Sequence, residues 1–134
     1  MAEKVGFVGL GTMGQPMAGR IMGAGFPLTV WNRNAAKTAD LAQKGAKVAG
    51  SPKEVAAQSD IIVSMISDGP ALEAITFGDN GIAAAIKTGS VFIDMSTVDP
   101  GSSMRVAKAV EAKGAKMLRA PVSGSTVLAS AGTL

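Results

Sequence analysis

Three glycines near the N-terminus have the spacing of a phosphate-binding turn. Gly9, Gly11 and Gly14 follow an apolar run in the pattern Gly-x-Gly-x-x-Gly. In such a turn the first glycine lets the strand bend sharply, the second lets the backbone approach a pyrophosphate, and the third lets the next helix pack closely on the strand. The amide groups and the positive dipole end of that helix attract phosphate. The pattern predicts a dinucleotide site with contacts from Gly9, Gly11, Thr12, Met13 and Gly14.

The residues after the second expected strand favour NADP as the cofactor. In NAD-specific folds an acidic residue about twenty positions beyond the glycines holds the ribose 2′-hydroxyl. Here that strand ends in Asn32 and Arg33, and Lys37 follows one turn later. A guanidinium and an amine can bind a 2′-phosphate but gain little from a hydroxyl. We therefore predict NADP, with NAD as the alternative, and contacts from all three residues; a solvated helix start is the other interpretation of the two cations.

Two further strand ends face the same predicted crevice. The run at residues 61–66 turns polar where it passes the adenosine half of the cofactor, which predicts contacts from Met65, Ile66 and Ser67. Ser96 and Thr97 follow the strand at residues 90–95 and are predicted near the nicotinamide or its ribose. Capping of the next helix is the competing interpretation for these two hydroxyls.

The elements that must position these residues follow a regular alternation. Apolar runs alternate with Ala-, Lys- and Glu-rich stretches of helical period, which is typical of βα units around a parallel sheet. Strands are predicted at residues 4–9, 27–32, 46–49, 61–66, 90–95 and 116–119. Helices are predicted at residues 13–24, 34–44, 52–58, 71–87 (with a break at 78–81) and 99–113. The predicted fold class is α/β: a Rossmann-type doubly wound parallel sheet of order 3-2-1-4-5-6, truncated before its last strand or strands.

The composition excludes several other classes of protein. The chain has 134 residues without cysteine or histidine, so only carboxylates remain as metal ligands and no metal site is predicted. Its 13 basic and 10 acidic residues are scattered, without the basic run that tracks a nucleic-acid backbone. No apolar stretch has the length of a membrane span, and the first strand begins at Lys4, too early for a signal peptide. We expect one cytoplasmic NAD(P)-binding domain at residues 1–134, with no nucleic-acid or membrane partner.

Three motifs together identify a family resemblance. Residues 9–18 hold the glycine fingerprint, residues 94–100 read Asp-Met-Ser-Thr-Val-Asp-Pro, and residues 120–125 read Ala-Pro-Val-Ser-Gly-Ser, before a closing Gly-Thr-Leu at 132–134. In this order and spacing they resemble the β-hydroxyacid dehydrogenase family across the whole chain. That family includes 3-hydroxyisobutyrate and 6-phosphogluconate dehydrogenases, tartronate semialdehyde reductases and glyoxylate/succinic semialdehyde reductases.

The resemblance implies an activity and further site residues. The family oxidises small β-hydroxyacids reversibly with NAD(P), and the matching positions imply that Ser123 and Gly124 hold the substrate carboxylate, with Ser96 and Thr97 beside the nicotinamide ribose. Arg119 stands where the family usually has an acid. The family's catalytic lysine is expected beyond Leu134, in a later segment, and its all-helical C-terminal domain, through which it would form a homo-oligomer, lies outside this chain. We therefore expect the chain alone to bind cofactor without catalysing.

Three alternatives remain open from the sequence. An imine reductase-like enzyme has a similar first domain, and a non-catalytic dinucleotide-binding regulatory module needs no lysine. A methyltransferase uses the same kind of turn but normally carries an acid where this chain has Asn32 and Arg33. The tail at residues 125–134 has few large apolar side chains, so it is predicted to be mobile, or ordered only by a neighbouring chain.

Overall fold

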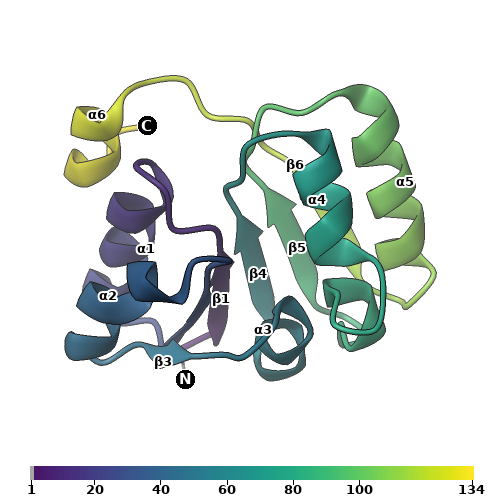
Figure 1. Cartoon of the computed structure of the whole chain (residues 1–134), viewed down its shortest axis with the longest axis horizontal. Helices are drawn as coiled ribbons and strands as arrows, with labels where there is room; N and C mark the ends of the chain where they lie inside the picture. The colour runs from purple at the N-terminus through teal and green to yellow at the C-terminus, as the bar shows by residue number, and fades with distance from the viewer. Residues whose placement is uncertain (1) are drawn as a thin grey trace.

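Six parallel strands form one sheet in the computed structural model, which describes residues 2–134 (Figure 1). The strands are β1 (Val5–Val8), β2 (Leu28–Trp31), β3 (Lys47–Val48), β4 (Ile61–Ser64), β5 (Val91–Asp94) and β6 (Lys116–Arg119). Their order is β3-β2-β1-β4-β5-β6, which confirms the predicted doubly wound topology. Because every pair is parallel, all carboxyl ends lie at one edge of the sheet, and the order reverses between β1 and β4.

Helices cover both faces of this sheet. They are α1 (Gly14–Gly23), η1 (Ala35–Thr38), α2 (Ala39–Gln43), α3 (Pro52–Gln58), α4 (Gly69–Thr76), η2 (Ile82–Ala84), α5 (Pro100–Glu111) and α6 (Thr126–Ala131). Buried residues of α1, α2 and α6 pack in one apolar cluster, and those of α3, α4 and α5 pack in another. The sheet therefore lies between two helical layers, and none of the helices within residues 2–134 is long and apolar enough to cross a membrane.

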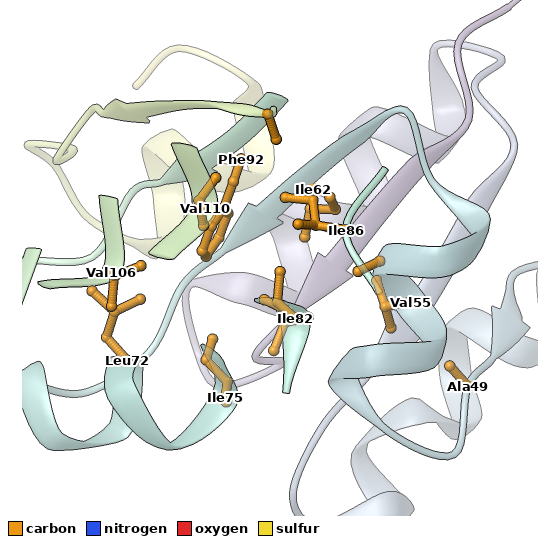
Figure 2. Packing of buried hydrophobic residues seen from close by; sticks show 13 residues of the cluster. Ala49, Val55, Ile62, Leu72, Ile75, Ile82, Ile86, Phe92, Val106 and Val110 are labelled. Atoms are coloured by element: carbon orange, nitrogen blue, oxygen red, sulfur yellow. The ribbon is translucent and has the colours of Figure 1, made fainter. Parts of the chain in front are cut away.

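The two central strands are apolar on both faces because both faces are covered. Phe7 and Val8 are successive residues of β1 and are both fully buried, yet Phe7 belongs to the cluster of α1 and Val8 to the cluster of α3, α4 and α5. Figure 2 shows Val55, Leu72 and Val110, from the three helices on this face, in one apolar cluster with Ile62 and Phe92 of the sheet.

Side-chain caps fix where three of the helices begin. Ser51 accepts a hydrogen bond from the Glu54 amide at 3.2 Å and so caps α3. Asp68 and Asp99 cap α4 and α5 in the same way, at 2.9 and 2.8 Å. A proline follows each cap in the first turn, where its missing N–H leaves no hydrogen bond unmade. The cap of α5 is thus Asp99, and neither Ser96 nor Thr97 serves that purpose.

Two predicted helices are shorter than expected. The helix predicted at residues 34–44 divides into the 3₁₀ helix η1 and the α-helix α2. Asn34 precedes both in an extended conformation, and its side chain caps η1. The helix predicted at residues 71–87 begins earlier, at Gly69, and ends at Thr76, so the predicted break falls just after it. Phe77 has an extended backbone (φ −95°, ψ 167°) and Gly78 has φ +84°, so the α-helix ends before the predicted break.

The tail was predicted to be mobile or ordered only by a neighbouring chain, but residues 126–131 form α6, which packs on this same chain. Ala129 of this helix is only 1% exposed and packs in the same cluster as Met17 and Ala18 of α1. Gly132, at φ +72°, ends the helix, and the Thr133 amide donates to the Leu128 carbonyl at 3.0 Å. This is a Schellman ending. A small side chain that permits close helix packing, and not a large apolar area, anchors the tail.

Candidate dinucleotide-binding site

A cavity of about 690 Å³ lies at the carboxyl ends of β1, β2 and β4. This is the place predicted from the reversal of strand order. Ten of the thirteen residues predicted to contact the cofactor lie on its wall: Gly9, Gly11, Thr12, Met13, Gly14, Asn32, Arg33, Met65, Ile66 and Ser67. The other three, Lys37, Ser96 and Thr97, do not.

The three glycines of the turn meet three different steric demands. Gly9 has φ +101°, and a Cβ there would collide with the Met65 carbonyl oxygen. A Cβ on Gly14 would collide with the Gly9 carbonyl oxygen, so this glycine allows α1 to pack against the turn. Gly11 differs from both, because no heavy atom lies within 4 Å of the position that its Cβ would take. Its backbone therefore faces the open cavity, as the approach of a pyrophosphate requires.

The first turn of α1 also fits a phosphate group. Met13 stands at its N-cap position and, within the described chain, no side chain caps this helix. In α3, α4 and α5 the amide of the third helical residue is bound by Ser51, Asp68 or Asp99, whereas the third residue of α1 is Pro16, which has no N–H. The Gln15 amide donates to the Gly11 carbonyl at 3.0 Å, so α1 offers a phosphate in the cavity its Gly14 amide and its positive dipole end.

Asn32 joins the end of β2 to the glycine turn. Its Oδ1 accepts a hydrogen bond from the Leu10 amide at 2.8 Å, and its Nδ2 donates to the Asn34 carbonyl at 2.9 Å. Both polar atoms of this side chain are therefore engaged within the protein while the residue lies on the cavity wall. These two hydrogen bonds fix the chain just before Arg33.

The two cations predicted for the 2′-phosphate lie in adjoining hollows. Arg33 is exposed on the wall of the main cavity. Lys37 lines a second hollow of about 370 Å³ that shares Gly11 and Thr12 with the main cavity. The Gln15 side chain donates to the Lys37 carbonyl and so ties α1 to η1 between the two.

The hydroxyl residues predicted near the nicotinamide lie outside the cavity wall. Ser96 is 3% exposed, and its Oγ accepts a hydrogen bond from the Ile66 amide at 2.8 Å. Thr97 is exposed. Ser123 and Gly124 are exposed on the segment that leads from β6 to α6 and passes above the carboxyl ends of the strands in Figure 1. The contacts predicted for these four residues stay predictions.

Four wall residues were missed by the sequence analysis. Trp31, the last residue of β2, lines the cavity and also packs against the cluster of α3, α4 and α5, and Ala71, Ala74 and Ile75 add one face of α4. Their spacing of three and four residues is the helical signal that could have found them. That α4 would turn this face toward the cavity depends on its position over the sheet, which periodicity alone does not give.

The fold and this site define a Rossmann-type dinucleotide-binding domain. The family model described as the NAD binding domain of 6-phosphogluconate dehydrogenase matches residues 4–134, and the chain belongs to this family. The resemblance to β-hydroxyacid dehydrogenases is thereby confirmed.

Two named relatives and one solved structure are similar to nearly the whole of this chain. The chloroplastic glyoxylate/succinic semialdehyde reductase 2 of Arabidopsis thaliana is 42% identical over 130 residues, which cover 97% of this chain and 36% of that protein. The mitochondrial 3-hydroxyisobutyrate dehydrogenase of Mus musculus is 42% identical over 136 residues, covering 100% of this chain and 41% of that protein. The solved structure of Psf3 in complex with NADP+ and 2-OPP has a TM-score of 0.89 and 30% identity, covering 96% of this chain and 45% of that one. The chain thus spans less than half the length of these relatives.

Proposed function

We propose that this chain is the NADP(H)-binding portion of an oxidoreductase that interconverts a small β-hydroxyacid and its semialdehyde or ketone. The observation that carries the cofactor assignment is Arg33 on the cavity wall directly after β2, where a domain selecting NAD would have a carboxylate. A guanidinium pairs with a phosphate through two parallel hydrogen bonds and has no comparable partner in a ribose hydroxyl. The NADP+ named in the solved relative supports the same choice.

The chain's own residues bind and orient the cofactor in this proposal. Backbone amides of the glycine turn and of α1 hold the pyrophosphate, and Arg33 holds the 2′-phosphate. The bound nicotinamide supplies or accepts the hydride. Ser123 and Gly124 hold the substrate carboxylate, and the proton-transferring lysine belongs to a part of the enzyme beyond Leu134. We expect the 134-residue chain alone to show no turnover, since acid–base assistance is worth roughly a hundred- to ten-thousand-fold.

We infer the type of reaction from the names of the relatives, and not from the residues that line the cavity. Both curated relatives carry names of semialdehyde or β-hydroxyacid enzymes. Reduction of an imine in place of a carbonyl would use the same cofactor cradle, and no residue on the cavity wall favours it. A small carboxylate as substrate, homo-oligomerisation through a further domain and a cytoplasmic location complete the proposal.

The cofactor assignment can be tested with the protein's own fluorescence. Trp31 is the single tryptophan of the chain and lies on the cavity wall, so a bound dinucleotide should quench it. We expect NADPH to bind more tightly than NADH by about 1–3 kcal/mol, or roughly five- to 150-fold in Kd. Adenosine 2′,5′-bisphosphate should displace NADPH more effectively than 5′-AMP does. Equal affinities in both comparisons would contradict the assignment of NADP.

A further inference from the structure

A buried polar network joins the ends of β4 and β5. Asp94, the last residue of β5, is 1% exposed, and its Oδ1 accepts hydrogen bonds from the Ser64 hydroxyl at 2.8 Å and from the Ser96 amide at 3.2 Å. The Ser96 hydroxyl in turn accepts from the Ile66 amide at 2.8 Å. Four residues from two neighbouring strand ends are thus linked in series.

This network begins where the backbone pairing of the sheet ends. Ser64 and Asp94 are partners in register, and the Met95 amide still donates to the Ser64 carbonyl at 2.9 Å. One residue further the Ile66 amide has a side-chain acceptor, the Ser96 hydroxyl, in place of a backbone carbonyl. Without that hydroxyl a part-buried amide would lose its partner, which favours a shift of the loop toward water.

The segment held in this way is one wall of the cofactor cavity. Residues 65–67 line it, and the glycine turn packs directly against them: a Cβ on Gly9 would lie 3.1 Å from Ile66 Cγ2. A displacement of Ile66 therefore changes both the wall and the support of the turn that faces the pyrophosphate. Ser96 is itself buried and does not line the cavity.

We propose that Ser96, held in place by Asp94, is a positioning residue that fixes residues 65–67 and so preorganises the cofactor cavity. Asp94 acts through Ser96, and Ser96 acts through Ile66. This inference rests on the proposed function for its ligand, whereas the link from Ser96 to Ile66 stands on its own geometry. It gives Ser96 a role independent of the predicted contact with the nicotinamide ribose.

The test compares two substitutions that each remove a buried serine hydroxyl, one at the carboxyl ends of the strands and one at their amino ends. Ser96→Ala removes the acceptor of the Ile66 amide. Ser59→Ala is the matched control, because Ser59 is fully buried and its hydroxyl donates to the Val55 carbonyl at 2.7 Å, beside the amino end of β1 and away from the cavity. Each variant is measured for NADPH and NADH affinity through Trp31, for the unfolding midpoint, and for hydrogen exchange of the Ile66 amide by NMR.

We expect Ser96→Ala to speed Ile66 exchange and to raise the Kd for NADPH by roughly three- to tenfold, in line with the loss of one hydrogen bond. The ratio of NADPH to NADH affinity should stay unchanged, because Arg33 is untouched. Ser59→Ala should lower the unfolding midpoint but leave both affinities as in the wild type. Should Ser96→Ala not fold, Ser96→Cys keeps a weaker acceptor and should show the same changes to a smaller extent.

The outcomes separate this inference from the proposed function. A wild-type chain that binds neither dinucleotide refutes the proposed function, while faster Ile66 exchange in Ser96→Ala still supports the positioning link. A wild-type chain that binds, together with a folded Ser96→Ala variant of unchanged affinity, overturns the role of Ser96 in preorganisation. Equal losses of affinity in the Ser96 and Ser59 variants would also overturn it, since the effect would then be general destabilisation.

Discussion

Arg105 of α5 donates its Nε–H to Glu73 Oε1 of α4 at 2.7 Å, and its Nη2 lies 3.2 Å from Glu73 Oε2. This two-point pair ties α5 to the helix that supplies Ala71, Ala74 and Ile75 to the cavity wall. The hydrogen bond from Arg105 holds the pKa of the Glu73 carboxyl below its ordinary value of 4.5. The pair therefore links the stability of the fold to pH.

We expect the stabilisation from this pair to be lost in acid. A carboxyl whose pKa is lower in the folded chain stabilises the fold above its ordinary pKa, and that contribution disappears as pH falls through the folded value. Glu73→Gln should therefore be less stable than the wild type at pH 6, and the difference should shrink below pH 4.5. Urea unfolding across this range measures the difference, with Glu111→Gln as a control that removes a carboxylate from an exposed residue of α5. A difference that does not vary with pH would contradict the linkage.

Arg33→Asp should narrow or invert the preference for NADPH. The change replaces a phosphate-binding cation on the cavity wall with an acid that repels phosphate and accepts from a ribose hydroxyl. We expect NADPH affinity to fall by about 1–3 kcal/mol, with NADH affinity unchanged or improved. Lys44→Asp makes the same change of charge on an exposed residue outside the cavity and should leave the ratio of affinities intact. If both variants shift the ratio equally, only the net charge of the protein matters.

Gly11→Val should abolish dinucleotide binding while the fold persists. The new side chain would point into open space, and Gly11 is not among the positive-φ glycines, so the backbone is not strained. The branched group instead fills the volume that a pyrophosphate needs, and we expect a loss of at least about tenfold in affinity, or 1.4 kcal/mol. Gly19→Val on α1 also adds a side chain in open space and should retain binding. Circular dichroism establishes that both variants fold; binding retained by Gly11→Val would mean that the turn is only structural.

Gly9→Ala and Gly25→Ala separate steric collision from backbone strain. Both glycines have similar positive φ values, +101° and +97°, but only at Gly9 would a Cβ meet other atoms. Gly25→Ala should lower the free energy of unfolding by about 1–3 kcal/mol, and Gly9→Ala by more. Denaturant titrations of the two variants give the comparison. Equal losses would show that the contact between the turn and Met65 relaxes without energetic consequence.

Much of this fold follows from the sequence because its signals are local. Apolar runs of β-rich composition place all six strands, and the helix predicted at residues 52–58 is α3 with the same bounds. The prediction for the tail failed because the structure of the tail depends on contacts between residues distant in sequence. The helix at residues 126–131 has little apolar area of its own, and it forms where Ala129 meets α1. A glycine at its end, Gly132, was the local signal that could have revealed it.

For the site, too, local sequence signals predicted the backbone and the loops but not the roles of the side chains. The fingerprint predicts which backbone faces a phosphate, and strand ends predict which loops form the wall. Side-chain roles depend on partners that periodicity does not show: both polar atoms of Asn32 are used by Leu10 and Asn34. The Ser96 hydroxyl likewise has the Ile66 amide as its partner. A motif thus locates a residue near a site more reliably than it assigns what the residue does there.

The division of the interior into two clusters has a consequence for how the domain tolerates change. Leu41 of α2 and Val106 of α5 are both buried, but they belong to different clusters on opposite faces of the sheet. With no shared neighbours, the losses of stability from Leu41→Ala and Val106→Ala should simply add in the double variant. The sheet then acts as a partition, so that sequence drift or deliberate repacking in one half of the interior leaves the other half free to vary on its own.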